Sequence, residues 1–255
     1  MKKDRKITPF LRWIGGKSRL VSHLENYIPP NFCSKNCYYE PFLGAGSLFF
    51  RITPSKAYLA DNNKDLIDCY IAIKNNPELI SKYLRKHLEN SSKEYYLKMR
   101  DKYNSSRLSN SKAALFIYLN KTCFNGIWRV NEKGHFNVPY GYKEPPLLPS
   151  KNDLLDISKA LSNVKLTHKD YKDTVTNTNE GDFIYLDPPY PPLNGTSYFT
   201  HYTKERFTKD NHTELALIAR ELDEMGCFVM ISNADIPYIR SLYEDSFNVF
   251  NLEVT

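Results

Sequence analysis

The fold is decided by residues 37–50, which read CYYEPFLGAGSLFF. The first part, Cys37–Phe42, is short, aromatic and apolar, as strands of a buried sheet are. It runs into the glycine-rich turn LGAGS at 43–47, and the apolar residues that resume after this turn indicate the start of a helix. The stretch therefore predicts a strand, a tight turn and a helix in immediate succession, which is how a unit of an α/β sheet begins.

The same order of elements recurs further along the chain. A second strand is expected at Ala57–Ala60, ending at Asp61, and helical periodicity follows over Leu66–Ile73. Because both strands are succeeded by helices, we expect a parallel sheet built from βαβ units. Beyond residue 150 we expect strands at Lys165–His168, Phe183–Leu186, Cys227–Ser232 and Asn248–Val254, and helices at Glu205–Met225 and Ile236–Tyr243.

The middle of the chain has a different character. Residues 77–120 are polar and helical, whereas Cys123–Tyr140 is rich in aromatic residues and asparagine, with Asn131–Gly134 as a hairpin turn. We therefore interpret residues 77–150 as a helical insertion that carries a β-hairpin. Residues 1–76 and 151–255 are expected to form one α/β domain around it.

Composition narrows the function classes. The 255 residues carry a net charge of +6, with basic residues concentrated in residues 1–20, which is consistent with a polyanionic partner. The five cysteines are odd in number and scattered, which favours free thiols in a reducing compartment over disulfides or a zinc site. The N-terminus has no signal-peptide pattern, and no apolar run is long enough to cross a bilayer. We expect a cytosolic protein without a metal or a membrane segment.

The segment Asp187-Pro188-Pro189-Tyr190 directly follows the strand expected at 183–186. The carboxylate of Asp187 can accept one N–H, and the carbonyl of Pro188 can accept a second. The two prolines stiffen the turn, and Tyr190 offers an aromatic face for stacking. These groups suit an exocyclic amine on a planar ring, although a proline-rich turn after a strand is also common in α/β proteins.

A glycine turn and an acid indicate a cofactor site. Gly44 and Gly46 lie at the carboxyl end of the first strand, where nucleotide-like cofactors bind such sheets. Asp61 ends the next strand, where its carboxylate can accept from ribose hydroxyls, can cap the helix that follows, or can do both. The pair favours an adenosine-bearing ligand without a pyrophosphate. Upstream, Lys17 can pair with a carboxylate such as a cofactor's methionine end, unless Trp13 and Lys17 simply begin a packed helix.

The insertion carries side chains suited to a DNA groove. Asn120, Asn125 and Arg129 are of the types that make bidentate base contacts, arginine to guanine and asparagine to adenine. Aromatic side chains and Ile127 can wedge at base steps. The hairpin is therefore a candidate groove reader. The alternative is a polar hairpin whose asparagines only build turns.

Taken in order along the chain, these motifs resemble those of the Dam-type DNA adenine-N6 methyltransferases, in the α-group arrangement of cofactor motifs, recognition insertion and catalytic motif. The matching motifs are Trp13-x-Gly15-Gly16-Lys17, Glu40-Pro41-Phe42-x-Gly44-x-Gly46, Asp61, Phe124-Asn125-Gly126-x-x-Arg129, Phe136-Asn137-Val138-Pro139-Tyr140-Gly141 and Asp187-Pro188-Pro189-Tyr190. The resemblance covers nearly the whole chain. It implies the doubly wound α/β fold of an S-adenosylmethionine-dependent methyltransferase, with an inserted helical and β-hairpin target-recognition domain.

The resemblance also implies a role for each matching residue. S-adenosyl-L-methionine would be bound by Trp13, Gly15, Lys17, Phe42, Gly44, Gly46, Asp61 and Asp187. The catalytic set would be Asp187, Pro188, Pro189 and Tyr190. Asp187 and the Pro188 carbonyl would hold the amino group of an adenine flipped out of the duplex, and Tyr190 would stack on its ring. Double-stranded DNA would be contacted by Phe124, Asn125, Ile127, Arg129, Asn137 and Pro139, with Phe124 intruding near the target base pair.

The expected function is methylation of adenine N6 in duplex DNA, at GATC, without a metal or a covalent intermediate. We expect a monomer in the cytoplasm, associated with the nucleoid and working beside a cognate restriction endonuclease. Relatives continue past the strand that matches Asn248–Val254 with one more edge strand, which this sequence lacks. Two alternatives stay open. One is methyl transfer to RNA adenine or to cytosine N4, and the other is an inactive, truncated DNA-binding protein.

Overall fold

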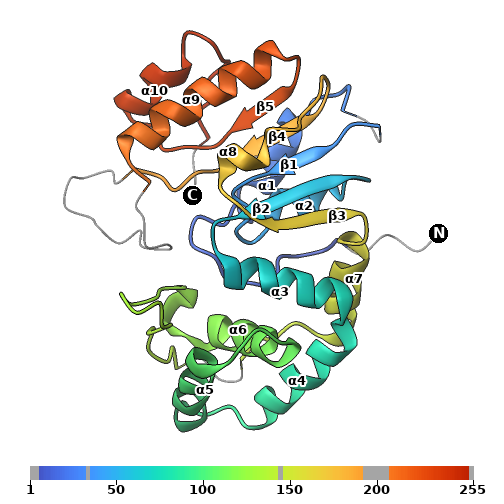
Figure 1. Ribbon diagram of the computed structural model, residues 1–255, viewed down its shortest axis with the longest axis vertical. Coiled ribbons are helices and arrows are strands. Elements are labelled where there is room, and N and C mark those ends of the chain that lie inside the picture. The colour runs from blue at the N-terminus through green and yellow to red at the C-terminus, as the bar shows by residue number, and fades with distance from the viewer. Residues whose placement is uncertain (1–5, 33–34, 143–145, 192–206, 253–255) are drawn as a thin grey trace.

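The computed structural model describes residues 6–32, 35–142, 146–191 and 207–252. In this part of the chain, five strands form one parallel sheet in the order β3-β2-β1-β4-β5 (Figure 1). The strands are β1 (Tyr38–Glu40), β2 (Ala57–Asp61), β3 (Val164–His168), β4 (Phe183–Leu186) and β5 (Phe228–Ile231). Tyr38 of β1 pairs with Ala57 on one side and with Phe183 on the other. The predicted parallel α/β sheet is confirmed.

The strand order contains a switch point between β1 and β4. From β1 the chain moves outward through β2 and β3, and it then returns across the sheet to β4 and β5. In doubly wound sheets, ligands bind outside the carboxyl ends of the two strands that flank such a point. The glycine turn after β1 and Asp187 after β4 both lie there.

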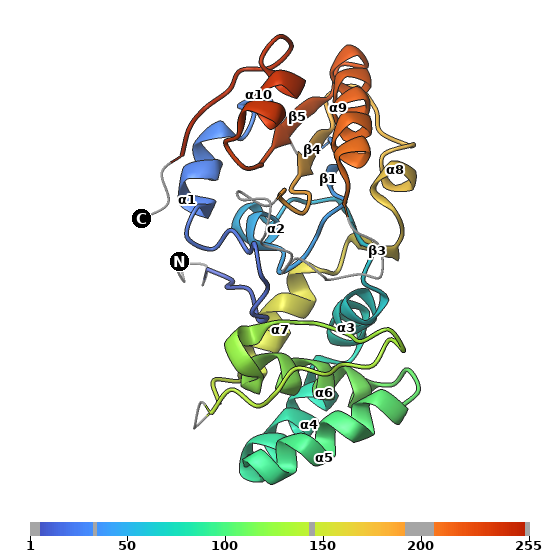
Figure 2. The same ribbon diagram turned by 90° about the vertical axis from the view of Figure 1, so that its left-hand side faces the viewer.

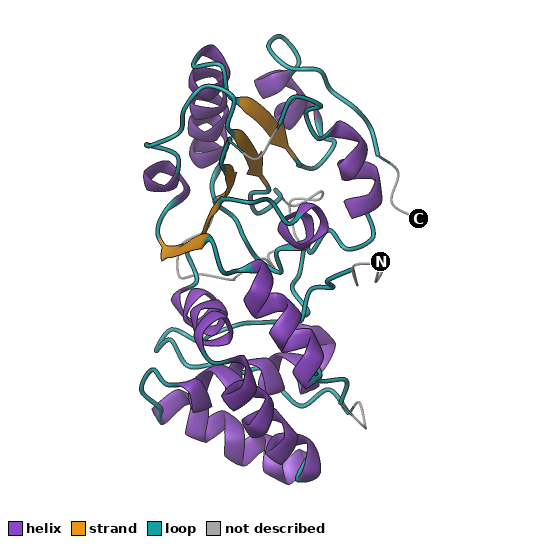
Figure 3. Cartoon of the chain, turned by 90° about the vertical axis from the view of Figure 1, so that its right-hand side faces the viewer, coloured by secondary structure: helices purple, strands orange, loops and turns teal. Residues whose placement is uncertain are grey.

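Helices cover both faces of the sheet, as the turned views show (Figures 2 and 3). One face packs against α8 (Tyr171–Thr174), α9 (Lys209–Glu224) and α10 (Pro237–Tyr243). The other face packs against α1 (Val21–Leu24), α2 (Ser47–Ile52), α3 (Lys64–Asn75) and α7 (Lys151–Ala160), with a 3-10 turn η1 (Glu25–Tyr27) after α1. No helix among the described residues is both long and apolar enough to span a membrane.

Residues 77–150 build a helical part at one end of the molecule (Figure 1). It contains α4 (Pro77–Glu89), α5 (Lys93–Ser105), α6 (Asn110–Thr122) and a 3-10 turn η2 (Phe124–Gly126). The helix α6 lies at its centre, because residues 113–120 are all buried. Phe116 and Trp128 belong to the same apolar core as Phe49 and Leu66 below the sheet. The division into domains at residues 76 and 150 stays a prediction.

The predicted β-hairpin is only partly confirmed. The turn at Asn131–Gly134 closes as predicted, since the Gly134 amide donates to the Asn131 carbonyl at 2.8 Å. Two strands do not form, because within 123–140 the structure has only the isolated antiparallel bridges Cys123–Tyr140 and Val130–Phe136. The side chain of Asn104, on α5, takes the place of a strand partner at Phe136. We call residues 123–140 the reading hairpin, after the role predicted for them from the sequence.

The strand predicted at Asn248–Val254 is wrong over its described part. Residues 248–252 adopt no strand, and residues 253 and 254 lie outside the described residues. Alternation of apolar and polar residues favours a strand only where a neighbouring strand is available to pair with it.

The long helix α9 begins later than predicted. Its first residue is Lys209, whereas the sequence pattern placed the start at Glu205, which lies outside the described residues. Thr208 caps the helix, because its hydroxyl accepts from the amide of Asn211 while the Asn211 side chain accepts from the amide of Thr208. Such a capping box fixes a helix start at its own position.

Candidate active site

The site is centred on Asp187, the residue that follows β4. The Nζ atom of Lys17 lies 2.7 Å from both carboxylate oxygens of Asp187, and it donates to Oδ2 and to the carbonyl of Gly15. The other oxygen, Oδ1, is buried and contacts Lys17 as the second oxygen of the ion pair, and the Tyr190 hydroxyl also hydrogen-bonds to this carboxylate. Burial raises the pKa of Asp187 above its ordinary value, and the nearby Lys17 opposes that rise. A buried carboxylate in an ion pair with a lysine therefore lies at the centre of the site.

Tyr190 and Lys17 lie against each other at this centre. The Lys17 ammonium lies 4.6 Å from the centroid of the Tyr190 ring, which is cation–π distance. Burial is the main cause that raises the pKa of Tyr190, with the Asp187 carboxylate adding to it. The structure thus brings Asp187, Tyr190 and Lys17 together, although the sequence did not predict the contact of Lys17 with the other two, and Pro188 and Pro189 directly follow Asp187. The carboxylate that Lys17 contacts here is Asp187, so its pairing with a cofactor carboxylate stays a prediction.

The glycine turn approaches Trp13 closely. Gly44 adopts a positive φ of 47°, and a Cβ there would lie 2.9 Å from Cδ1 of Trp13. Asp61 fixes this turn, because its Oδ2 accepts from the Gly44 amide at 2.9 Å while Oδ1 accepts from the Asn63 amide at 2.8 Å. Burial raises the pKa of Asp61 to about 6. The alternative that Asp61 caps α3 is wrong, since Asn63 is the N-cap and accepts from the Leu66 amide.

Two more predicted cofactor residues border this turn. Phe42 stacks on Tyr171 with 5.3 Å between ring centroids, and Phe207 meets the Phe42 ring edge-on. Gly46 has a φ of 65° at the start of α2. Aromatic faces and carboxylate acceptors at the ends of β1 and β2 fit the adenosine part of a nucleoside cofactor.

Glu40 is a functional candidate that sequence reasoning quoted in a motif but gave no role. It is only 2% exposed, and Oε2 accepts from the Tyr38 hydroxyl at 2.9 Å. Burial raises the pKa of Glu40 to about 8, and the nearby Asp187 adds to the rise. Strongly shifted carboxyl groups gather at functional sites. The signal in the sequence was an acidic residue at the end of a strand that is otherwise apolar.

Ser232, which follows β5, also borders the centre and was not predicted. Its Oγ lies 2.9 Å from the Tyr185 hydroxyl, and Tyr185 is buried in β4 two residues before Asp187. A serine after a strand carries no distinctive sequence signal, so its place could be found only from the structure.

The predicted DNA-facing residues lie on the reading hairpin. Phe124 is 50% exposed, and Asn125 next to it is exposed with a φ of 53°. The exposed Arg129 donates from Nε to Oδ1 of Asn137 at 3.0 Å, so these two side chains act as one unit. In Figure 1 the hairpin lies on the left, the side toward which the carboxyl ends of the strands point, and it faces the viewer in Figure 2.

The remaining hairpin residues differ in exposure. Pro139 is exposed, whereas Ile127 is half-buried against the apolar core. Trp128, between Ile127 and Arg129, is buried and stacks on Phe136 with 4.3 Å between centroids. It anchors the hairpin rather than facing outward.

Asn120 does not belong to the reading surface. The prediction that it could contact bases is wrong, because its side chain is completely buried at the end of α6. Its amide is used inside the protein, where it bonds to the main chain of Arg12.

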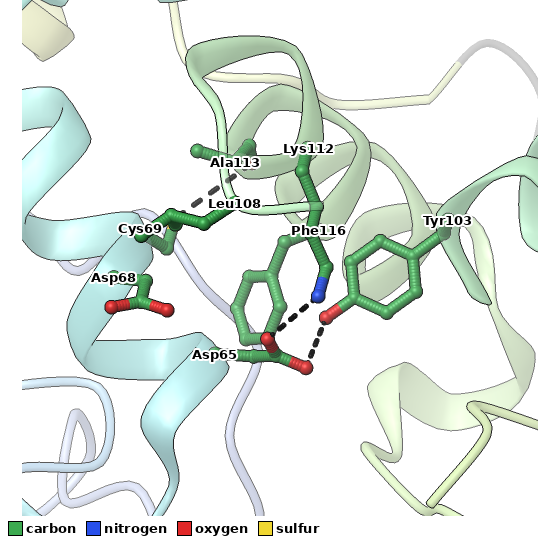
Figure 4. A pocket seen from close by; sticks show the side chains of 8 residues that line it. All are labelled: Asp65, Asp68, Cys69, Tyr103, Leu108, Lys112, Ala113 and Phe116. Carbon is green, nitrogen blue, oxygen red and sulfur yellow. Dashed lines mark hydrogen bonds and ion pairs between the residues drawn. The ribbon is translucent and has the colours of Figure 1, made fainter. Parts of the chain in front are cut away.

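A small pocket between α3 and the helical part lies apart from this site. Figure 4 shows Asp65 there, accepting from the Tyr103 hydroxyl at 2.6 Å and from Lys112 at 3.0 Å. These bonds satisfy the carboxylate and join α3 to α5 and α6. The pocket is therefore part of the contact between the two halves of the molecule.

Metal ligands do not gather in the described ranges, where no three His, Cys, Asp or Glu side chains are placed to hold an ion. Cys37, Cys69, Cys123 and Cys227 are free thiols, and Cys33 lies outside the described residues. The functional groups of the described site are carboxylates, a lysine and aromatic rings.

A parallel sheet with a glycine turn after β1 and an acid at the end of β2 is the fold of an S-adenosylmethionine-dependent methyltransferase. The site at its switch point places a carboxylate where an amine could be held. The sequence model of the D12 class N6 adenine-specific DNA methyltransferases matches residues 13–255, and the chain belongs to this family. The predicted resemblance to the Dam-type enzymes is confirmed.

Whole-chain relatives agree with this assignment. The chain is 40% identical over 255 residues to the type II methyltransferase M1.LlaDCHI of Lactococcus lactis subsp. cremoris, covering 98% of this chain and 88% of that protein. It is 39% identical over 261 residues to the type II methyltransferase M.MjaIII of Methanocaldococcus jannaschii, covering 95% and 90%. It is 35% identical over 246 residues to the DNA adenine methylase of Escherichia coli K12, covering 96% and 86%. The chain is thus a DNA adenine-N6 methyltransferase.

Proposed function

We propose that this enzyme transfers the methyl group of S-adenosyl-L-methionine to N6 of an adenine that is flipped out of duplex DNA, within the sequence GATC. The observation that carries the proposal is Asp187, which lies at the switch point of the sheet in an ion pair with Lys17 and whose carboxylate oxygens have lone pairs beyond that contact. The GATC assignment rests on the likeness of the Phe124–Arg129 segment to that of relatives with this site.

The amine cradle consists of Asp187 and the carbonyl of Pro188. An adenine amino group has two N–H bonds, and these two acceptors take one each. Accepting both makes the nitrogen more tetrahedral and its lone pair more available for attack. Tyr190 stacks on the ring and fixes its plane. As N6 takes the methyl group it would give up one of its two protons to solvent, so the protein contributes mainly positioning and a polar environment.

The residues around the glycine turn fit the cofactor. When bound, S-adenosyl-L-methionine would supply a methyl group on a positively charged sulfonium, from which a neutral thioether leaves readily. Asp61 keeps a lone pair on each oxygen beyond the bonds it makes to Gly44 and Asn63, and these suit ribose hydroxyls. Phe42 and Trp13 border the same turn, and together with Gly15, Gly44, Gly46 and Lys17 they would hold the cofactor.

DNA reading is assigned to the exposed side chains of the reading hairpin. Arg129 and Asn137 form one hydrogen-bonded unit whose remaining donors can reach a guanine edge. Phe124 is a large exposed apolar side chain, and such side chains insert at base steps. Asn125, Ile127 and Pro139 complete the surface. A base must leave the stack before its amino group can be reached, so the hairpin and the cradle act on the same duplex.

The names of two relatives support a role in restriction and modification. Both are type II methyltransferases, and we propose that this enzyme likewise works beside a cognate restriction endonuclease. It would act as a monomer in the cytoplasm, where its DNA substrate is found.

Transfer of labelled methyl groups tests the proposal. Purified protein is incubated with labelled S-adenosyl-L-methionine and, in separate reactions, with duplex DNA containing GATC, the same duplex with the guanine changed, and RNA of the same sequence. We expect incorporation into the GATC duplex and protection of that site from an endonuclease that cuts only unmethylated GATC. Incorporation into RNA, or into cytosine of the duplex, would instead favour the two other amino acceptors. Absence of incorporation by folded protein would refute the proposal.

A further inference from the structure

Asn120 is an asparagine whose side chain is completely buried. It lies near the end of α6 and is 0% exposed, amid the buried residues that form the centre of the helical part. Burying an amide is costly unless its donors and acceptor are satisfied. A leucine would fill a similar volume without that cost, so the bonds that Asn120 makes are the feature to explain.

Those bonds join residues that are far apart in the sequence. The amide of Arg12 donates to Oδ1 of Asn120 at 2.8 Å, and Nδ2 of Asn120 donates back to the carbonyl of Arg12 at 2.7 Å. The same Nδ2 lies 3.4 Å from the carbonyl of Gly126 in the 3-10 turn η2. One side chain thus replaces a strand partner for Arg12 and also touches the turn that presents Phe124 and Asn125.

The segment that Asn120 holds leads directly to the catalytic centre. Arg12 precedes Trp13, which covers the glycine turn at Gly44, and Lys17, which pairs with Asp187. At its other end, the segment packs closely against the reading hairpin. A Cβ on Gly126 would lie 2.5 Å from Cβ of Arg12, which leaves no room for a side chain there. Residues 12–17 therefore form a short connection between the turn that meets DNA and the carboxylate that meets the amine.

We propose that Asn120 is a positioning residue that fixes the position of the turn η2 relative to the amine cradle. Because Asn120 bonds to both Arg12 and Gly126, a displacement of the turn η2 also displaces the segment that carries Trp13 and Lys17. This inference rests on the proposed function, since it assumes that the turn contacts DNA and that Asp187 holds the target amine.

A second asparagine provides a matched control. Asn104 on α5 makes the same reciprocal pair, donating from Nδ2 to the carbonyl of Phe136 at 3.0 Å and accepting from the Phe136 amide at 2.9 Å. Both bonded groups belong to Phe136 of the reading hairpin, and Asn104 makes no such bond to residues 12–17. Loss of the Asn104 pair therefore loosens the hairpin without touching the connection to Asp187.

The test compares Asn120→Asp with Asn104→Asp. Each change keeps the size of the side chain and the oxygen acceptor but removes the N–H donor. For each variant, the affinity for cognate duplex is measured first, followed by the single-turnover rate of methyl transfer with both duplex and S-adenosyl-L-methionine saturating. We expect Asn120→Asp to lower the single-turnover rate about 10- to 100-fold, as a small misplacement of reacting groups does, with a much smaller change in duplex affinity. For Asn104→Asp we expect weaker duplex binding and a nearly unchanged single-turnover rate.

A second variant covers the case in which Asn120→Asp does not fold. Gly126→Ala disturbs the same contact from the hairpin side, because the new Cβ meets Arg12, and it should reproduce the slow single turnover. A folded Asn120→Asp or Gly126→Ala protein with the wild-type rate would overturn the inference. Equal slowing by Asn104→Asp would overturn it too, since general loosening would then explain both. A wild-type protein that transfers no methyl group would refute the proposed function itself, whereas these variant results leave that function intact.

Discussion

The amine cradle and the reading hairpin are built in opposite ways. The proposed cradle, Asp187 and the carbonyl of Pro188, directly follows a buried strand, so the hydrogen bonds of the sheet fix where Asp187 lies. The reading hairpin has only two isolated bridges, and side-chain contacts hold it instead. Asn104 of α5 pairs with Phe136 of the hairpin, and the hairpin's own Trp128 packs between Phe116 of α6 and Phe136.

This difference separates the chemistry from the reading of sequence. A group attached to a central strand cannot move without disturbing the whole sheet. A hairpin held by a few side chains can change its exposed residues while the same anchors keep its backbone in place. We therefore expect changes in the cradle to abolish transfer, changes in the anchors to cost stability, and changes on the exposed face of the hairpin to alter only the preferred site.

The largest effect is expected at the cradle. Asp187→Ala removes the acceptor for the amino group and leaves Lys17 without its partner, so the single-turnover rate should fall on the order of 10³- to 10⁴-fold. Rapid-quench measurement of labelled methyl transfer gives this rate. Asp101→Ala, an exposed change on α5, is the control and should keep the wild-type rate. A near-normal rate for Asp187→Ala would show that the cradle lies elsewhere.

The anchors of the hairpin should come next. Trp128→Ala removes a buried ring that packs on Phe116 and Phe136, so the free energy of unfolding should fall by about 3–4 kcal/mol. Phe124→Ala removes an exposed ring from the same hairpin and should change stability by less than about 0.5 kcal/mol. Urea denaturation followed by circular dichroism measures both. Similar losses for the two variants would contradict the division between anchors and exposed face.

The exposed face should govern specificity. Arg129→Ala should reduce discrimination against a duplex with a changed guanine by about 1–3 kcal/mol, because one bidentate base contact is lost. The ratio of kcat/KM on the two duplexes measures this difference. Arg85→Ala, an exposed arginine on α4, provides the control. An unchanged ratio for Arg129→Ala would remove its assigned role.

The smallest effect concerns pH and Glu40 beneath the cradle. Burial raises the pKa of Glu40 to about 8, so the folded protein keeps a proton that the unfolded chain has already released. Its contribution to stability is therefore present at low pH and is lost as the pH rises through about 8. The slope can reach at most about 1.4 kcal/mol per pH unit for one group.

Comparison of the wild type with Glu40→Gln over the pH window from about 7 to 8 isolates this group. The pKa values of His87 and His212 are lowered to about 4 in the folded protein, whereas these side chains titrate near 6.5 in the unfolded chain, so they add the same opposite slope to both proteins. The free energy of unfolding of the wild type should fall across the window. Glu40→Gln should lack the part of this fall that belongs to Glu40, and an equally steep fall in that variant would assign the slope to another group.

Local chemistry made the cradle predictable. The strand at Phe183–Leu186 was expected with the bounds that the structure shows, because a run of apolar residues ends at an acid and two prolines. The glycine turn and Asp61 were predictable for the same reason, since strand, turn and acid are close together in the sequence. The bonds from Asp61 to Gly44 and Asn63 were not predictable, because they depend on how the turn closes.

Contacts between segments that are distant in the sequence limited what could be predicted from it. The alternation at 248–252 favours a strand, yet strands depend on partners that the local pattern does not contain. Asn120 shows the same limit at one residue, because the amide that can pair with a base pairs equally well with a main chain. Its partner Arg12 is 108 positions away, and only the fold reveals that it is buried.

The central claim, that the cradle sets the modified atom and the hairpin sets the site, is tested most directly on a pool of duplex DNA with randomised sequence. Wild type and Arg129→Ala are each incubated with the pool and S-adenosyl-L-methionine, the modified base is identified by mass spectrometry, and its context is read by sequencing. We predict N6-methyladenine from both proteins, confined to GATC for the wild type and spread over contexts with a changed guanine for the variant. Methylcytosine, or one identical context from both proteins, would contradict the account.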